Sequence, residues 1–313
     1  MHADDVKVSI GMPVFNGSNF IAEAIESVLA QSLSDFELII TDNASTDDTC
    51  EIVESYAARD ERIRLIRNEK NIGAAANYNR SYEVAQGKYL KWCAHDDSMS
   101  PNVLEACVDT METDPTVSLA FPRTIGIDDQ GNIIKAVGDS TPSLLDEDPS
   151  VRFQKSILLA GTCFPIFGVF RKSQLDRSTL HRAYYGSDRG LLAEIAIMGK
   201  FKRVDDAIFY NREHTQRSIN IDDKLVRSEW QNGASSRKAS SEHINLSLHL
   251  YEIAGRHRDI SPAWKMRRKL IPHALSPRQI GRYGLEATGL LSPKAASLFK
   301  SLLSRRNKTS QRI

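Results

Sequence analysis

The stretch FELIITDNASTDD, residues 36–48, decides the fold of this 313-residue chain. Its first half is a short apolar run, typical of a buried strand, and its second half is a turn rich in Asp, Asn, Ser and Thr. A carboxylate directly after a buried strand lies where open α/β sheets bind their ligands. Asp42 is therefore a candidate to accept the ring N–H of a nucleotide base such as uracil. The alternative for Asp42 and Asp47 is local, because Asp residues at this place also cap helices.

The segments on both sides of this stretch alternate between strand and helix patterns. We expect strands at 6–13, 36–41, 63–67 and 88–94, and helices at 19–31, 49–59 and 74–86. Short strands separated by such helices indicate βαβ units. The sequence therefore predicts an α/β fold with a mostly parallel central sheet flanked by helices, and a ligand site at the carboxyl ends of the strands.

The second half of the chain follows a different pattern. Residues 116–171 read as shorter strands and loops, and residues 187–199 as a helix with an acidic start and a Gly stop. Beyond about residue 220 the pattern is helical, and three segments open with Ser-Pro, as helix N-termini commonly do. We expect an α/β domain at 1–220 and a basic helical C-terminal region at 221–313.

Charge is unevenly distributed along the chain. Residues 251–313 contain 14 Lys or Arg and 3 Asp or Glu, against 27 and 37 in the rest, although the formal net charge is only +1. A basic tail on an acidic body favours contact with a membrane surface, a polyanion or the body itself. The pattern SPKAASLFKSLLSRR at 292–306 is typical of a short interfacial helix, with docking on its own domain or a homodimer contact as alternatives. The tail contains no recognised nucleic-acid-binding module, so we expect no nucleic-acid partner.

Three features favour a cytoplasmic protein. The N-terminal Met-His-Ala-Asp-Asp lacks the basic and apolar regions of a signal peptide, and no stretch approaches 18 apolar residues. The four cysteines are widely spaced, without a C-x-x-C pair, which is typical of a reducing compartment. We expect a cytoplasmic protein, peripheral at the inner face of the membrane if the tail binds lipid.

Two further predicted strands end in polar motifs. Met12-Pro13-Val14-Phe15-Asn16-Gly17 closes the first strand, although its composition is also that of an ordinary turn. His95-Asp96-Asp97 follows the strand at 88–94. Adjacent carboxylates repel each other unless a cation is present, and hard oxygen ligands suit Mg²⁺ or Mn²⁺ bridging phosphates. The alternative is a solvated Asp pair in a turn.

These three motifs, in this order, resemble those of the family 2 glycosyltransferases, which have the GT-A fold. The resemblance covers roughly residues 6–215 and includes an N-x-G loop, here Asn71-Ile72-Gly73. It implies a nucleotide-sugar-binding fold with a helical C-terminal extension. The donor-binding residues that it implies are Pro13, Val14, Phe15, Asn16, Asp42, Asn71, Gly73, Asn77 and Asp96.

The resemblance also implies a divalent metal, Mn²⁺ or Mg²⁺. Asp97 would ligate it, and His214 resembles the family's C-terminal residue that reaches the diphosphate or the metal, with Arg212 and Arg217 as alternatives for holding phosphate. The sequence departs from the family pattern at three places: Asp42-Asn43 replaces paired carboxylates, Tyr78-Asn79 stands where members often have Arg-Asn, and His95 replaces an acidic residue.

Asp188 is the candidate catalytic base. Inverting members of the family place a carboxylate at the start of a helix after the acceptor loop, and Gly186-Ser187-Asp188-Arg189 occupies that place. The same Ser-Asp pattern is an ordinary N-terminal capping signal. The apolar segment 162–171 resembles the floor of the acceptor site, with core packing the simpler interpretation for Ile166, Val169 and Phe170.

The sequence therefore predicts a metal-dependent inverting glycosyltransferase. It would move a sugar from a nucleoside-diphosphate sugar, UDP-sugar favoured, to a hydroxyl of a glycan or lipid-linked acceptor, with Asp188 removing the acceptor proton. A sugar-nucleotide pyrophosphorylase is disfavoured because MPVFNG is not a Gly-rich, Arg-containing loop. A dinucleotide-dependent dehydrogenase is disfavoured because no G-x-G-x-x-G follows the first strand. A non-catalytic nucleotide-sugar-binding homologue stays open.

Overall fold

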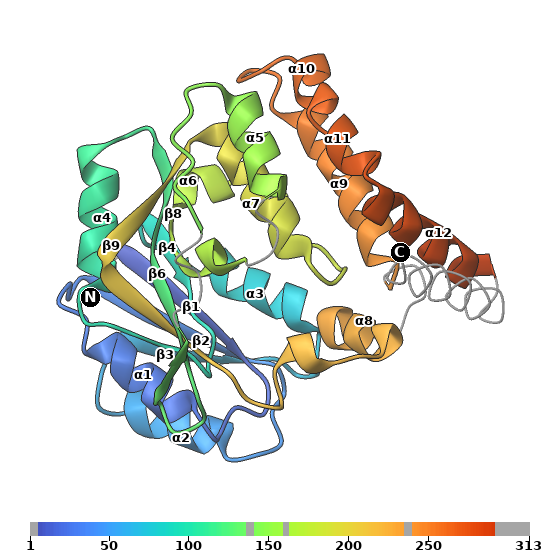
Figure 1. Cartoon of the computed structure of the whole chain (residues 1–313). Coiled ribbons are helices and arrows are strands. Elements are labelled where there is room, and N and C mark those ends of the chain that lie inside the picture. The colour runs from blue at the N-terminus through green and yellow to red at the C-terminus, as the bar shows by residue number, and fades with distance from the viewer. Residues whose placement is uncertain (1–5, 136–140, 159–162, 235–239, 292–313) are drawn as a thin grey trace.

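A single curled sheet forms the centre of the molecule (Figure 1). The computed structural model describes residues 6–135, 141–158, 163–234 and 240–291. The sheet has the strand order β3-β2-β1-β4-β8-β6-β9-β5, with β7 paired to β6. The strands are β1 (Val8–Val14), β2 (Phe36–Asp42), β3 (Ile63–Arg67), β4 (Tyr89–Trp92), β5 (Ser98–Met99), β6 (Val117–Ile127), β7 (Ile133–Lys135), β8 (Val169–Arg171) and β9 (Lys200–Arg212).

The helices follow the expected alternation in the first hundred residues and then gather toward the C-terminus. They are α1 (Ile21–Leu29), α2 (Thr49–Ala57), α3 (Ala74–Glu83), α4 (Val103–Thr113), α5 (Pro149–Leu158), α6 (Lys172–Leu175), α7 (Ser187–Met198), α8 (Lys224–Asn232), α9 (Glu242–Arg256), α10 (Ala263–Arg268), α11 (Ile271–Ala274) and α12 (Pro277–Leu291). Two 3₁₀ turns, η2 (Phe164–Phe167) and η3 (Ser218–Asn220), complete the described elements. None of the described helices is long and apolar enough to cross a membrane.

The α/β fold is confirmed, and the sheet is more mixed than expected. Strands β3, β2, β1 and β4 are parallel neighbours, as the βαβ pattern predicts. Beyond β4 the sheet changes direction, because β8 runs antiparallel to both β4 and β6, whereas β6 and β9 are parallel. The description "mostly parallel" therefore holds for the first half of the sheet only.

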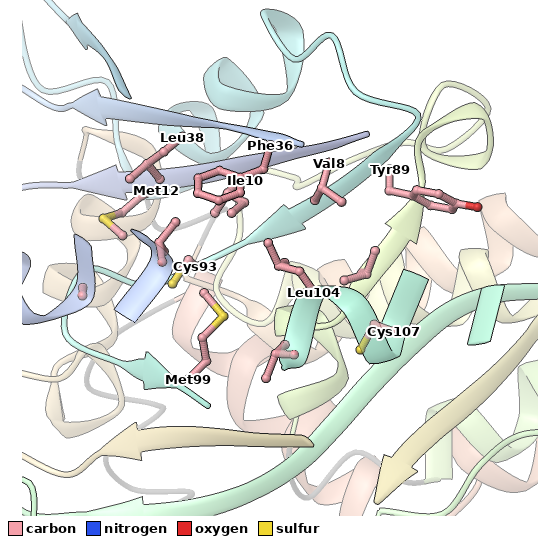
Figure 2. Packing of buried hydrophobic residues seen from close by; sticks show 14 of the residues in the cluster. Val8, Ile10, Met12, Phe36, Leu38, Tyr89, Cys93, Met99, Leu104 and Cys107 are labelled. Atoms are coloured by element: carbon pink, nitrogen blue, oxygen red, sulfur yellow. The ribbon is translucent and has the colours of Figure 1, made fainter. Parts of the chain in front are cut away.

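Two apolar cores lie on the two faces of the sheet, because successive side chains of a strand point to opposite faces. Phe36, Leu38 and Ile40 of β2 join the core under α1, α2 and α4, while Ile39 joins the other core with side chains of α7. Figure 2 shows part of the first core, where β1, β2 and β4 pack against α4. Ile166 and Phe170 are also buried in the second core, which agrees with the core-packing interpretation of their segment.

The prediction of shorter strands and loops for 116–171 was wrong in two places. β6 has 11 residues, more than any strand from β1 to β4, and residues 149–158 form α5, whose main apolar anchors are Phe153 and Ile157. Arg152 is buried on the same helix and donates to the carbonyls of Ala196 and Ile197 at the end of α7. A helix whose inner face carries an arginine has a weak apolar period, which explains why α5 was not predicted.

A third core joins α5 and α7 to α9 and α10, so residues on both sides of the predicted boundary at 220 share it. A buried polar network lies beside it. The Glu194 carboxylate accepts from the Thr179 N–H and hydroxyl, both at 2.7 Å, and lies 2.8 Å from Nε2 of His257. His249 bridges Thr179 Oγ1 at 2.7 Å and the Tyr184 hydroxyl at 2.8 Å. These bonds are all satisfied when the His249 imidazole is neutral, with Nε2 donating and Nδ1 accepting.

We expect acid to weaken this junction through His249. Burial lowers the pKa of its imidazole to about 4 from the ordinary 6.5, so below pH 6.5 the unfolded chain takes up a proton that the folded chain refuses. The free energy of unfolding should therefore fall between pH 6.5 and about 4, by on the order of 1–2 kcal/mol at pH 5. Urea denaturation of wild type and His249→Gln at pH 7.5 and 5.0 measures this.

The variant is the control for other titrating groups, because the loss of stability on acidification should be smaller in His249→Gln, whatever its stability at pH 7.5. An equal loss in both proteins would contradict a neutral, buried His249.

Candidate functional site

The loops after β1 and β2 are tied to each other at the carboxyl edge of the sheet. Val14 and Asp42 are register partners at the ends of these strands. Asn16, at φ 51°, donates its N–H to Ser45 Oγ at 2.9 Å and accepts from the Thr46 N–H at 2.8 Å. Asp47 accepts from the Ser18 N–H at 3.1 Å. The two segments that the resemblance assigns to the base pocket therefore form one connected unit.

The two carboxylates of the second loop are held differently. Burial raises the pKa of Asp47, but hydrogen bonds from Thr49 and Ser18 outweigh it and the net pKa is lowered. Asp42 is 0% exposed; it accepts long hydrogen bonds, at 3.2 and 3.3 Å, from the Ser45 N–H and is also hydrogen-bonded by the Cys50 thiol. Pro13 and Val14 are buried in β1, whereas Phe15 is 41% exposed at its end.

A chain of amides holds the N-x-G loop against β2. Asn43 donates to Asn71 Oδ1 at 2.9 Å and accepts from the Ile72 N–H at 2.9 Å, while Asn71 Oδ1 also accepts from the Gly73 N–H at 2.8 Å. Asn77 is 2% exposed, donates to the Thr41 carbonyl at 2.7 Å and accepts from Asn68 at 2.9 Å. Both ends of the Asn77 amide are thus engaged within the protein, so its contacts here position the loop.

The two carboxylates after β4 have different surroundings. Asp97 is 3% exposed and its Oδ1 accepts from the Arg212 N–H at 2.8 Å and from Asn211 Nδ2 at 3.1 Å. Asp96 is the more accessible, with 17% of its side chain exposed, and its Oδ2 lies 2.8 Å from Nε2 of His214. The structure thus brings His214 to this motif from the end of β9, and its contact is with Asp96.

The two negative charges of Asp96 and Asp97 repel each other. Burial and the negative charge of Asp96 raise the pKa of Asp97 well above its ordinary value. Burial also acts to raise the pKa of Asp96, but the His214 hydrogen bond and the nearby His95 lower it overall. A divalent cation would relieve this repulsion, and carboxylate oxygens with an imidazole nitrogen form a donor set that suits Mn²⁺. The donor types present therefore suit the expected metal, but the ligand atoms of Asp96, Asp97 and His214 do not all lie within 4.8 Å of one another.

The buried side chain of Arg212 holds the Asp96-Asp97 motif in place through hydrogen bonds to backbone carbonyls. Its side chain is 1% exposed, and it donates to the carbonyl of Asp96 at 2.9 Å and to those of Asp128 and Asp129 at 3.0 and 3.1 Å. The guanidinium also pairs with Glu23 and lies 4.9 Å from the centre of the Phe20 ring. The arginine that the sequence offered as a phosphate ligand is therefore fully engaged within the protein.

Replacing Arg212 should cost more stability than replacing an ordinary surface arginine. Arg212→Met leaves the three carbonyls without their donor and removes the partner of Glu23, so we expect a loss of about 3–5 kcal/mol in the free energy of unfolding. Urea denaturation measures it, with Arg59→Met in the exposed turn after α2 as the control, expected within about 0.5 kcal/mol of wild type. Equal effects of the two changes would contradict the supporting role.

Asp188 is the second residue of α7, which follows Gly186 at φ 84°. Its Oδ1 accepts from the N–H of the next residue, Arg189, at 2.9 Å. Burial raises the pKa of Cys163, and the charge of Asp188 raises it further. Asp188 thus lies close to Cys163 and Arg189, and these two residues line a pocket together with Phe121 and Leu192.

An aromatic cluster joins α3 to β4 and His181, and the sequence did not predict it. The ring of Tyr78 on α3 lies 5.1 Å from that of His181 and 6.4 Å from that of Trp92. Burial raises the pKa of the Tyr78 phenol, and the charges of Asp96, Asp97 and Asp188 raise it further, so carboxylates from both motifs act on this phenol. The departure from Arg to Tyr at position 78 was the available signal; His181 carried none.

Two arginines near Tyr78 in the sequence do not face the carboxylate pair as free charges. Arg67 forms an ion pair with Glu54, and Arg80 forms one with Glu83. The interfacial-helix pattern at 292–306 lies outside the described residues. Among the described residues, the group whose His, Cys, Asp or Glu ligand atoms converge is Glu242, His243 and Glu286. Its carboxylates pair with Lys224 and Arg227 and tie α8 to α9 and α12.

The comparisons with known proteins agree with this geometry. The model of the family described as glycosyl transferase family 2 matches residues 9–173, more than half of the chain. The chain belongs to glycosyl transferase family 2. The match spans β1 to the start of α6 and includes the three strand-end motifs.

Curated relatives match parts of the chain. It is 34% identical over 127 residues to "Chondroitin synthase" of Escherichia coli, covering 41% of this chain and 18% of that protein. It is 26% identical over 186 residues to "GalNAc(5)-diNAcBac-PP-undecaprenol beta-1,3-glucosyltransferase" of Campylobacter jejuni, covering 59% of this chain and 58% of that protein. The chain therefore spans less than two thirds of the length of these relatives.

A solved structure shares the fold. S. aureus TarS 1-349, solved in complex with UDP-GlcNAc, superposes with a TM-score of 0.59 at 16% identity, covering 90% of this chain and 80% of that chain. The GT-A fold with its helical C-terminal region is therefore confirmed.

Proposed function

We propose that this protein transfers a sugar, with inversion, from a nucleoside-diphosphate sugar to a hydroxyl of a glycan or lipid-linked acceptor. The observation that carries this proposal is the position of Asp96 and Asp97 directly after β4, inside the segment that the glycosyl transferase family 2 model matches. The charges of these two residues and of Asp188, at the start of α7, all act on the Tyr78 phenol. A donor bound at the strand ends would have its reacting carbon between a phosphate-facing pair and a separate carboxylate.

The base of the donor would bind between the tied loops after β1 and β2. The hydrogen bonds of Asp42 to the Ser45 N–H and the Cys50 thiol do not use all its acceptor sites, so its carboxylate retains capacity to accept a ring N–H. Uracil is our first choice, which agrees with the UDP-GlcNAc in the TarS structure. Phe15, exposed at the end of β1, is available to contact the base.

Asp97 and His214 would hold Mn²⁺ or Mg²⁺, with Asp96 in contact with His214 and facing the ribose or the donor sugar. When bound, the cation supplies neutralisation of the charge that builds on the departing diphosphate. The protein's own contribution is to orient these side chains: the Arg212 backbone and Asn211 fix the Asp97 carboxylate. Such support of ligating groups is worth as much to a metal site as their identity.

Asp188 would remove the proton of the acceptor hydroxyl as that oxygen attacks the anomeric carbon. Its bond to the Arg189 N–H fixes one carboxylate oxygen and leaves the other to accept. The acceptor and donor would be held on opposite sides of Tyr78, and this alignment supplies part of the rate. A peripheral position at the membrane would bring such an enzyme to a lipid-linked acceptor.

A thermal-shift panel tests the donor site. We expect UDP, among UDP, GDP, dTDP and CMP, to raise the melting temperature of the wild type by several degrees in the presence of Mn²⁺, because a ligand that binds only the folded state stabilises it. Asp97→Asn should lose the metal-dependent part of this shift. The control is Asp109→Asn on the exposed side of α4, which should keep it.

Stabilisation by a different nucleotide would change the donor assignment, and an undiminished metal-dependent shift in Asp97→Asn would remove Asp97 from the metal site.

Turnover tests the catalytic base. Asp188→Asn should lower the rate of UDP release from the donor that the panel identifies about 10²–10⁴-fold, measured with a panel of glycan acceptors, because it loses general-base catalysis. Its affinity for UDP, measured by calorimetry, should stay within about twofold, since Asp188 does not touch the nucleotide. Undiminished turnover with intact binding would overturn the assignment, and binding without turnover in the wild type would favour the non-catalytic homologue.

A further inference from the structure

An apolar stripe runs along the outer side of α10 and α11. Backbone hydrogen bonds from Lys269 to Met266 and from Ala274 to Leu270 carry the helical path from one helix into the other. Trp264, Ile271 and Leu275 are 68%, 52% and 65% exposed. Their spacing, seven and then four residues, places them on one face of this path. In Figure 1 the two helices lie at the margin of the molecule, away from the central sheet.

The opposite side of α10 fixes the direction in which the stripe points. Met266 is 1% exposed and belongs to the third core, and the Arg267 guanidinium stacks on the ring of Tyr251 in α9, 4.0 Å from its centre. Residues two apart on a helix point in nearly opposite directions, so burial of Met266 directs Trp264 and Arg268 outward. The exposed stripe is therefore a fixed feature of the packed structure.

The stripe lies in a strongly basic surface. Residues 256–282 contain eight Lys or Arg and one Asp, Asp259, which pairs with Arg177. Arg268, Lys269 and Arg278 form no ion pair with any carboxylate in the described part of the chain. Positive charge beside exposed Trp, Ile and Leu is the composition of an interfacial helix on anionic lipid.

We propose that the α10–α11 surface docks the protein on an anionic lipid bilayer. Trp264, Ile271 and Leu275 would enter the boundary between headgroups and acyl chains, while Arg268 and Lys269 contact lipid phosphates. A second copy of the chain is disfavoured as occupant, because two such surfaces would bring like charges together. The proposal does not depend on the sugar-transfer reaction. Within the basic tail at 251–313 that the sequence analysis related to a membrane surface, it assigns the contact to α10 and α11 instead of the pattern at 292–306.

Vesicle flotation of the full chain tests the surface. We expect binding to vesicles of phosphatidylcholine with 30% phosphatidylglycerol, weak binding to phosphatidylcholine alone, and a decrease as salt rises. Leu275→Asp should weaken binding about tenfold or more, because it places a charge in the apolar stripe. Arg268→Glu should weaken it at least about fivefold, since each basic residue near such a surface contributes on the order of that factor.

The matched control is Ile133→Asp in β7, where the replaced side chain is 67% exposed, close to the 65% of Leu275. It should bind vesicles as the wild type does. Circular dichroism and melting temperature confirm that each variant is folded, and UDP binding reports on the donor site separately. Unchanged binding of Leu275→Asp would overturn the proposal. The proposal would also be overturned if the wild type did not bind vesicles and light scattering showed a dimer that Leu275→Asp dissociates. The surface would then be a contact between copies of the chain.

Discussion

The candidate site depends on one buried guanidinium. Arg212 is 1% exposed, and its bonds reach the backbone at Asp96 and at Asp128 and Asp129, while its own N–H donates to Asp97. A charge this deeply buried is tolerated only when nearly all its donors are satisfied. Three backbone carbonyls and the Glu23 carboxylate meet that requirement here, so the Asp96 and Asp97 carboxylates are not used as its partners.

The first hundred residues could be read from the sequence because their signals are local. The strand at 63–67 has the predicted bounds, and the other six elements there differ by a few residues at their ends. The antiparallel insertion of β8 between β4 and β6 could not be predicted, because β8 has only three residues and its partners are distant in sequence. Helix α5 was missed because the buried Arg152 interrupts its apolar face.

The same distinction applies to the site. Carboxylates that follow strands can be recognised in the sequence, and Asp42, Asp96 and Asp97 were identified in this way. Asp188, at the start of a predicted helix, was also identified as a candidate from the sequence. Their contacts were not, because the pairing of Asp96 with His214 and the engagement of Asp97 by Asn211 join residues far apart in the chain. Tyr78 and His181 were missed for the same reason, since an aromatic residue in a helix or loop reads as packing until its neighbours are known.

Because Arg212 lies far beyond Asp96 in the sequence, their contact can form only some time after Asp96 has been synthesised. Arg212 bonds the Asp96 carbonyl across 116 residues, and translation at roughly 5–20 residues per second takes about 6–23 s to cover that interval. During that time the nascent chain holds β1 to β4 but lacks β9, so Asp96 and Asp97 lack the hydrogen bonds that Arg212 makes to them. The apolar edge of the half-built sheet is also uncovered. This site can mature only after β9 has left the ribosome, and early exposure of that edge gives chaperones a defined interval in which to act.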